Sequence, residues 1–125
     1  MSAHADWIGR QRRRMAVLEA SDLARLAAVL DRPAPPSAVP PAWHWACLGE
    51  PVRRSDLGRD GHPRRGLFLP PIDAPRRMFA AAEMTFNGPL LADVETDLVE
   101  TIVHIEEKSG ASGPLTFVTL ERVFS

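Results

Sequence analysis

Proline is concentrated in one part of this chain, because ten of its twelve prolines lie between residues 33 and 75. Proline fixes φ and has no N–H, so no continuous helix or central strand can cross this segment. The segment is nevertheless apolar, with Trp43, Trp45, Leu48 and Leu57, and a structureless linker of this length is unusual inside a compact domain. We therefore predict an ordered, irregular crossing, with helical turns at residues 42–48 and an exposed turn at residues 58–63.

A short amphipathic helix is predicted at residues 21–31, before this crossing. Ser21 is expected to act as the N-cap, because its hydroxyl can accept an unpaired backbone N–H. Apolar residues recur at helical spacing, and Pro33 should end the helix. The apolar stripe consists of Leu23, Leu26, Ala27 and Leu30.

A strand is predicted within residues 10–19, where Met15 and Val17 share one face. The arginines Arg12, Arg13 and Arg14 have two interpretations. They can mark a phosphate site, or they can form a solvated strand edge on which charge discourages pairing with another sheet, and we favour the second.

After the crossing the apolar pattern changes to a period of two, which indicates strands. We predict a strand that starts near Arg77 and places Met84 and Phe86 on one face. A second strand over residues 93–107, a hairpin loop at residues 109–113 and a return strand over residues 114–124 follow. In the second strand Val99, Thr101, Val103 and Ile105 are predicted to share one face. The fold class is therefore α+β, with a helix packed on a curved antiparallel sheet.

Composition excludes several classes of function. The 125 residues suit one domain, and a net charge of −1 argues against nucleic-acid binding. The single cysteine, Cys47, forms no intrachain disulfide and is expected to be a small buried residue in a reducing, cytoplasmic setting. No apolar run has membrane-spanning length, and no His, Cys or acidic residues have metal-ligand spacing, so we expect no membrane, metal or cofactor.

Several strings in the chain resemble the MaoC-like hydratases and dehydratases, specifically the N-terminal half of the branch that includes mesaconyl-CoA hydratase and hydroxyacyl-thioester dehydratases. They occur in the order of that family and cover nearly the whole chain. The strings are DWIGR (6–10), ARLAAVLD (24–31), PPAWHWACL (40–48), LGRDGHPRRGLFLPP (57–71), PRRMFAAAEMTFNGPL (75–90) and EKSGASGPLTFVTLER (107–122).

This resemblance implies a hotdog fold, in which a curved antiparallel sheet wraps a helix, over residues 1–125. It also implies that two such units pair, as a homodimer or heterodimer. In the active members an Asp and a His of a DxNPxH motif add water to, or remove it from, a 2-enoyl thioester. The thioester is carried by CoA or by a carrier protein.

The chain departs from this pattern in two places. DxNPxH is absent, since Asn87 is the only Asn and Gly88 follows it, so we assign no catalytic residue here. The family's first unit also has a further strand beyond the position of Ser125, which we expect a partner to supply or the chain to lack. The resemblance implies a non-catalytic N-terminal-type unit that shapes the acyl or CoA channel. The alternatives are a thioester-binding or scaffolding subunit without catalysis, and a truncated fragment.

The candidate binding residues lie in the crossing and in the segment that follows it. Arg64 with Arg65 and Arg76 with Arg77 form two pairs, which either bind CoA or carrier-protein phosphates or serve in ion pairs and solvation. His44 either lines an acyl pocket or anchors the crossing by packing, and we favour packing. The remaining members of the predicted channel wall are Trp43, Phe68 and Met78.

Overall fold

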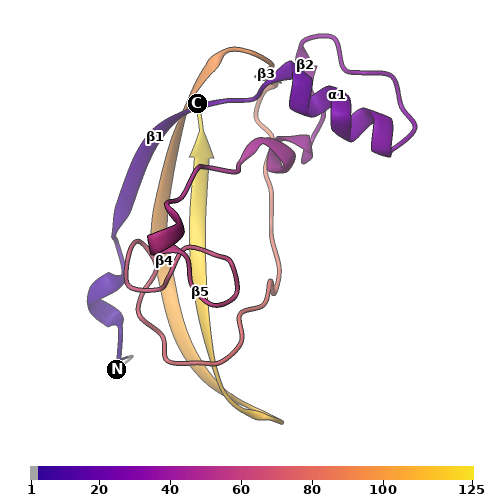
Figure 1. Cartoon of the computed structure of the whole chain (residues 1–125). Coiled ribbons are helices and arrows are strands. Elements are labelled where there is room, and N and C mark those ends of the chain that lie inside the picture. Colours follow the sequence, from indigo (N-terminus) through magenta and orange to yellow (C-terminus); the bar gives the residue numbers. More distant parts are fainter. Residues whose placement is uncertain (1–2) are drawn as a thin grey trace. The chain divides into compact units, whose positions relative to one another are not determined.

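The chain folds as an α+β protein with a curved antiparallel sheet and one α-helix, as predicted and consistent with a hotdog fold (Figure 1). The computed structural model describes residues 3–125. A three-stranded sheet has the order β1-β4-β5, and β2 pairs with β3 in a separate two-stranded sheet. The elements are η1 (Ala5–Trp7), β1 (Gln11–Val17), α1 (Ala20–Val29), β2 (Ala38–Val39), η2 (Trp43–Cys47), η3 (Arg54–Asp56), β3 (Leu90–Leu91), β4 (Glu95–Gly110) and β5 (Gly113–Phe124).

The contacts within the chain divide it into two compact units. Unit 1 comprises the residues up to Arg13, residues 51–78 and residues 99–123. Unit 2 comprises residues 14–50, 79–98 and 124–125. The backbones of β1 and β4 each pass from one unit into the other, and each unit is described by itself below.

Strand β1 alternates strictly between an inner and an outer face. Ala16 is buried, and Leu18 just after the strand is fully buried on the same face. Met15 and Val17 do share a face, as predicted, but that face is the exposed one. The apolar pair that marked the strand in the sequence is therefore not the pair that enters the core.

Helix α1 begins at Ala20, and its N-terminus is capped from a distant part of the chain. The prediction of Ser21 as N-cap was wrong, because Ser21 lies inside the first turn and Glu19 occupies the N-cap position without a side-chain hydrogen bond. Instead the backbone N–H of Ala20 donates to Oδ1 of Asp93, 2.9 Å away. Asp93 has a φ of 60°, a conformation that Asp tolerates better than most residues.

The C-terminus of α1 closes with a Schellman motif. Asp31 adopts a φ of 55°, its N–H donates to the carbonyl of Ala28 at 3.2 Å, and the N–H of Arg32 donates to that of Ala27 at 2.9 Å. The helix therefore ends before Pro33, as predicted.

The core of unit 2 is a small cluster at the start of α1. Leu18 and Leu23 are almost completely buried, and each such leucine stabilises the fold by about 1.5–3 kcal/mol relative to an exposed one. Of the predicted helical stripe, Leu23 and Ala27 are buried, whereas Leu30 is exposed. The other members of the cluster are Val39, Trp43, Cys47, Leu90 and Ala92.

The proline-rich crossing is ordered, as predicted. Residues Trp43–Cys47 form a 3-10 helix, and Ala42 before it has a φ of 72° that turns the chain. The predicted turn is closed by a hydrogen bond of 2.7 Å from the N–H of Gly58 to the carbonyl of His62, with Gly61 at a φ of 81°.

The strand predicted to start near Arg77 is absent, and only Leu90–Leu91 is a strand in this region. Residues 79–89 carry the alternating pattern of a strand, but no strand of the described residues 3–125 pairs with them. A strand exists only when a neighbour satisfies its backbone groups, and an alternating pattern cannot supply that neighbour.

The final two strands form a hairpin, as predicted, but the loop that joins them is shorter than predicted. β4 extends to Gly110 and β5 begins at Gly113, so the turn is tighter than residues 109–113. In β4 the buried positions alternate as far as Ile102, and then Ile105 is buried while Val103 is exposed. Val103 and Ile105, which were predicted to share a face, therefore differ in burial, and their common face stays a prediction.

Candidate functional site

Unit 2 contains a half-open hollow of about 410 Å³. Its walls come from the paired strands β2 and β3, the prolines before η2 and the extended segment that leads into β3. The walls are predominantly apolar, with the imidazole of His44 and the side chain of Asn87 as their polar side chains. The lining residues are Ala38, Val39, Pro40, Pro41, His44, Phe86, Asn87, Gly88, Pro89 and Leu90.

His44 is held at the wall of this hollow by aromatic rings. It is 6% exposed, and its ring meets those of Phe86 and Phe124 edge to face, at centroid distances of 6.3 and 5.0 Å. A third ring, that of Trp45, lies 6.5 Å away. His44 therefore packs against aromatic rings and also lines the hollow, while its predicted contact with an acyl chain stays a prediction.

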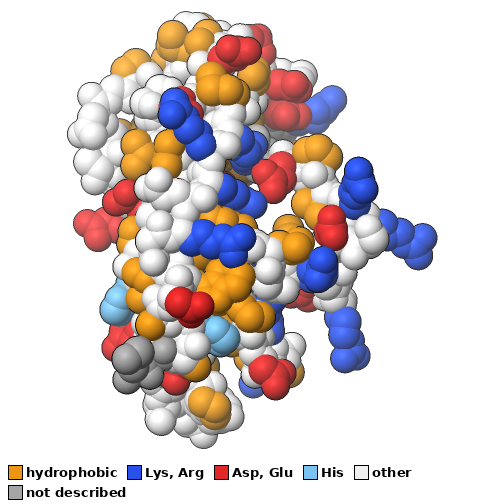
Figure 2. Space-filling model, turned by 90° about the vertical axis from the view of Figure 1, so that its left-hand side faces the viewer, with side chains coloured by type: hydrophobic (Ala, Val, Ile, Leu, Met, Phe, Trp, Pro, Cys, Tyr) orange, Lys and Arg blue, Asp and Glu red, His pale blue; other side chains and the backbone are white. Residues whose placement is uncertain are grey.

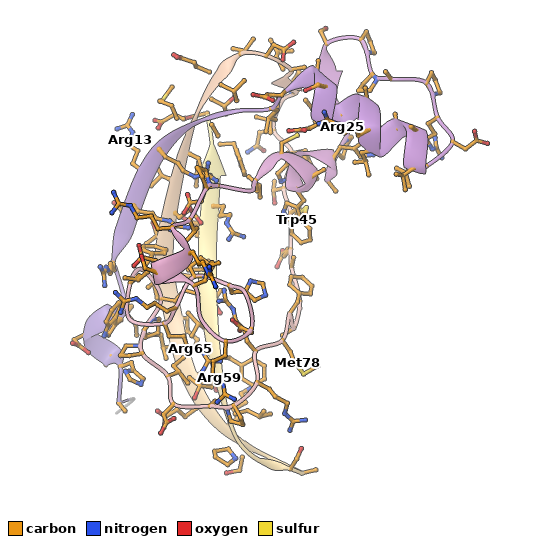
Figure 3. All side chains as sticks on the ribbon, viewed as in Figure 1. Arg13, Arg25, Trp45, Arg59, Arg65 and Met78 are labelled. Carbon is orange, nitrogen blue, oxygen red and sulfur yellow. The ribbon has the colours of Figure 1, made fainter. Side chains whose placement is uncertain are left out.

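The two neighbouring tryptophans have different environments. Trp43 is half-buried against the core cluster of unit 2 and does not line the hollow. Trp45, labelled in Figure 3, is 43% exposed. Its ring meets that of Phe79 edge to face, with a centroid distance of 5.7 Å. Met78, which was predicted to line the channel, is 83% exposed (Figure 3).

In unit 1 the two members of the predicted pair Arg64 and Arg65 make different contacts. The guanidinium of Arg65 donates to the carbonyls of Ile72 and Ala74, and more weakly to that of Arg76 at 3.5 Å. Arg65 therefore clamps the loop that contains Pro70 and Pro71. Its neighbour Arg64 lies on the surface, 3.7 Å from the Asp56 carboxylate.

Arg76 and Arg77 are exposed, and no hydrogen bond or ion pair of their side chains is described within residues 3–125. Arg77 does act on Asp60, whose pKa is lowered by the backbone N–H of His62 and, to a smaller extent, by the Arg77 charge. Binding of a charged ligand by Arg76 and Arg77 stays a prediction. Figure 2 shows that basic side chains and hydrophobic side chains both reach the surface on the face displayed there.

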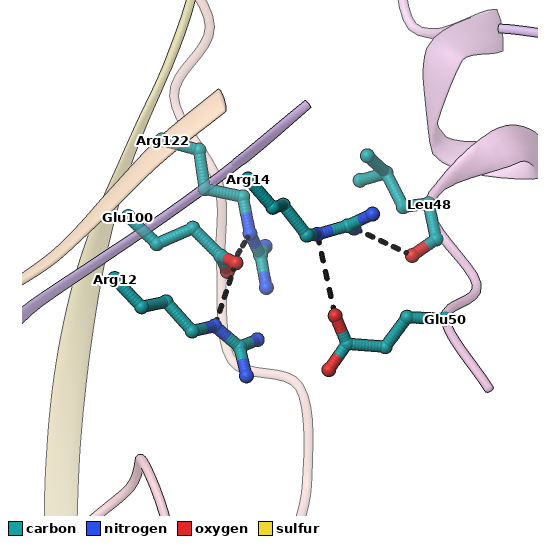
Figure 4. A network of polar contacts seen from close by, with 6 residues as sticks. All are labelled: Arg12, Arg14, Leu48, Glu50, Glu100 and Arg122. Carbon is teal, nitrogen blue, oxygen red and sulfur yellow. Dashed lines mark hydrogen bonds and ion pairs between the residues drawn. The ribbon is translucent and has the colours of Figure 1, made fainter. Parts of the chain in front are cut away.

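Unit 1 also contains a charged cluster that sequence reasoning missed (Figure 4). The carboxylate of Glu100, whose side chain is 2% exposed, accepts from Nε of Arg12 at 2.9 Å and from Nε of Arg122 at 3.0 Å. Burial acts to raise the pKa of Glu100, but the two arginines outweigh it and lower the pKa. The sequence does contain a signal for a buried carboxylate, because Glu100 alternates with Leu98 and Ile102 on one face of the strand.

For Arg12 and Arg14 these contacts correct the prediction of a solvated strand edge, whereas Arg13 lies on the exposed face of β1. Arg12 and Arg14 point to the inner face, since alternate residues of a strand share a face. In unit 2, Arg14 donates to the carbonyl of Leu48 at 3.0 Å and lies 3.3 Å from the Glu50 carboxylate (Figure 4). Strand β1 is an edge strand, but its inner arginines are committed to specific acceptors.

Phe68, another predicted wall residue, packs against the charged cluster. The guanidinium carbon of Arg12 lies 4.5 Å from the centre of the Phe68 ring, a cation–π contact that fixes the plane of the guanidinium. Phe68 and Arg65 both stiffen the loop over residues 65–76, one through a ring contact and the other through backbone hydrogen bonds.

Among residues 3–125 no three His, Cys, Asp or Glu side chains are arranged to hold a metal ion. Within the same residues no helix has the length and apolarity needed to cross a membrane. The thiol of Cys47 is half-buried in unit 2, and burial together with the carboxylates of Asp22 and Glu19 raises its pKa. A raised pKa leaves little thiolate at neutral pH, so Cys47 is not an activated nucleophile.

Comparison of the sequence with protein-family profiles identifies the family of this chain. The profile of the hydroxyacyl-thioester dehydratase type 2 family matches residues 42–125. The chain belongs to this family, and the resemblance to MaoC-like hydratases and dehydratases is confirmed.

A particular relative in this class is the mesaconyl-C(4)-CoA hydratase of Chloroflexus aurantiacus. It is 42% identical to this chain over 118 residues. The match covers 91% of this chain and 42% of the relative, so the chain spans less than half the length of that protein.

Proposed function

We propose that this chain is a non-catalytic hotdog unit of an acyl-thioester hydratase or dehydratase. The observation that carries the proposal is that this sequence belongs to the family but does not contain its DxNPxH motif. The only Asn of the chain is Asn87, and it is followed by Gly88 rather than Pro. In this proposal a second hotdog unit supplies the Asp and the His that handle water and the proton.

The hollow of unit 2 supports a role in shaping the substrate channel. A mainly apolar cavity with a few polar groups is the usual form of a small-molecule site. The hollow suits the acyl or pantetheine part of a thioester, with His44 as a polar group at its wall. The exposed Arg76 and Arg77 suit the phosphates of CoA or of a carrier protein's phosphopantetheine arm.

Unpaired backbone supports the proposal of a partner unit, identical or different. Residues 79–89 are strand-like in sequence and do not pair with a strand within residues 3–125. Exposed apolar side chains also occur on the strands, among them Val103 on β4 and Leu115 and Val123 on β5. Open backbone and exposed apolar strand positions favour association with another chain.

The test is the hydration of crotonyl-CoA and mesaconyl-CoA, followed by the loss of enoyl-thioester absorbance. We expect no turnover by the purified chain, and turnover when it is co-expressed with a unit that carries DxNPxH. Robust turnover by the chain alone would refute the non-catalytic assignment. If the chain binds the thioester but shows no turnover even with a unit that carries DxNPxH, the scaffolding alternative is favoured.

The role of the exposed arginines is tested by the double variant Arg76→Ala/Arg77→Ala in the assembled complex. We expect weaker binding of CoA esters with unchanged turnover at saturation, because these side chains would hold phosphate rather than the reacting atoms. The matched control is Arg25→Ala, which removes an exposed arginine of α1 that pairs with Asp22. Equal CoA-ester affinity in the double variant and the wild type would show that Arg76 and Arg77 do not contact the ligand.

A further inference from the structure

Among the residues that the structure describes, no lysine or arginine lines the hollow of unit 2. Three lining residues are prolines, Pro40, Pro41 and Pro89, which have no backbone N–H and cannot donate a hydrogen bond. The side-chain donors of the wall are the imidazole of His44 and the neutral amide of Asn87. The wall therefore offers little that can hold a negative charge.

A carboxylate inside this hollow would leave water without meeting a permanent positive charge. An ionised carboxylate only accepts hydrogen bonds, and its burial is unfavourable unless donors or an opposite charge replace the lost water. His44 is buried in the wall, and the rings of Phe86 and Phe124 lie against its imidazole. An uncharged acyl chain has no such cost, and each CH₂ group that it buries raises the affinity by about fourfold.

The hollow is also held in shape before a ligand enters. Prolines fix φ on both sides of it, at Pro40 and Pro41 after β2 and at Pro89 before β3. Strands β2 and β3 pair in antiparallel register, with Val39 opposite Leu90. Its volume of about 410 Å³ lies within the range of about 300–1,000 Å³ that is usual for small-molecule sites, and a preformed cavity needs little reorganisation to bind a chain.

We propose that the hollow binds the acyl chain of the thioester and selects an uncharged chain over one that ends in a carboxylate. This inference rests on the proposed function, because it assigns one part of the same thioester ligand to the hollow. The substrate class is then the acyl groups of monocarboxylic acids, such as crotonyl or hexanoyl, and not those of dicarboxylic acids, such as mesaconyl or adipoyl. The pantetheine arm stays outside the hollow, because its amides need hydrogen-bond partners that the wall lacks.

The first experiment compares two thioesters of equal chain length, S-hexanoyl-N-acetylcysteamine and S-adipoyl-N-acetylcysteamine, of which only the adipoyl ester ends in a carboxylate. Both acyl groups are saturated, so no water can be added to them during the measurement. The chain of 13.8 kDa is suited to nuclear magnetic resonance, and its backbone amide resonances are followed during each titration. The titrations are made at about pH 7.5, where an ordinary histidine is mostly neutral.

We expect saturable shifts at Val39, Gly88 and Leu90 with the hexanoyl ester. The adipoyl ester should bind about tenfold more weakly, because about two CH₂ groups stay in water together with its carboxylate. Binding of the adipoyl ester as tight as that of the hexanoyl ester would overturn the proposal. Saturable shifts confined to residues outside the hollow, or no saturable shift with either ester, would overturn it as well.

The second experiment places a positive charge at the wall of the hollow. Asn87→Lys should tighten the binding of the adipoyl ester by about threefold or more and should leave that of the hexanoyl ester nearly unchanged, because only the adipoyl ester has a carboxylate to pair with. The matched control is Val29→Lys, which adds the same charge on the exposed face of α1 in the same unit. The control should keep the wild-type preference for the hexanoyl ester.

Circular dichroism establishes that each variant is folded before its affinity is compared. Equal tightening of the adipoyl ester by Asn87→Lys and Val29→Lys would mean that the ligand responds only to net charge, and would refute selection by the hollow. If Asn87→Lys does not fold, the two titrations of the wild type still decide the question.

Failure of this inference can be told apart from failure of the proposed function. The two probes lack the CoA nucleotide and cannot be hydrated, so their binding does not depend on a catalytic partner. Equal affinity for both probes together with turnover of crotonyl-CoA by the assembled complex would refute the selection and leave the proposed function standing. A preference for the hexanoyl ester without turnover in the complex would refute the proposed function alone.

Discussion

Glu100 is the residue whose replacement tests the structural reasoning most directly. Replacing it with Gln keeps the size of the side chain and removes the charge that Arg12 and Arg122 share. Breaking a buried ion pair by removing one partner costs about 3–5 kcal/mol when the other charge stays buried. Here both arginines are 39% exposed and can be rehydrated, so we expect a smaller loss, about 2–3 kcal/mol in the free energy of unfolding.

The charge of Glu100 also sets the pH dependence of this loss. The pKa of Glu100 is lower in the folded than in the unfolded chain, where it lies near its usual value of about 4.3. Its contribution is therefore fully present above that value and disappears as the pH falls through the folded pKa. The stability difference between the wild type and Glu100→Gln should be largest at pH 7 and should shrink below about pH 4.

The assay is urea unfolding followed by tryptophan fluorescence at pH 7 and at several lower pH values. The matched control is Glu106→Gln, since Glu106 is an exposed residue of the same strand that pairs with His104 and Lys108. The control should change the free energy of unfolding by no more than about 0.5 kcal/mol. A Glu100→Gln loss no larger than that of the control, or one that does not vary with pH, would refute the proposed charge network.

Three further predictions concern unit 2. Asp93→Gly keeps the positive φ but removes the cap of α1, so it should lower the free energy of unfolding in urea by about 0.5–2 kcal/mol. Asp93→Asn keeps an acceptor oxygen and should lower it less. Equal losses in the two variants would argue against the cap. Leu23→Ala should lower the free energy of unfolding by about 2–5 kcal/mol because it opens a cavity in the core, while Val29→Ala on the exposed face of α1 should have little effect; similar effects of the two would contradict the packing of the helix. Because the pKa of Cys47 is raised, its alkylation by iodoacetamide in the folded chain should be slower at pH 8 than in the urea-unfolded chain, and reaction at the same rate in both states would show that the thiol is not protected.

Local patterns in the sequence predicted the elements that depend on residues close to one another. Helix α1 follows from its apolar spacing and from Pro33, and the final hairpin follows from two strand-like runs around a glycine-containing loop. The ordered crossing follows from apolar residues among prolines. The quoted family strings predicted membership of the thioester hydratases, because such strings remain recognisable without knowledge of their contacts.

Tertiary structure decided the features that join distant residues. Glu100 meets Arg12 across 88 positions, and Asp93 caps Ala20 across 73, distances that no local pattern encodes. For the same reason Ser21, which suits a cap by composition, does not serve as one. Residues 79–89 alternate like a strand but pair with no strand in the described part of the chain, residues 3–125. A side chain's type limits what it can bind, but the partner that the fold brings within 3 Å decides whether an arginine clamps a loop, as Arg65 does, or holds a buried carboxylate, as Arg12 does.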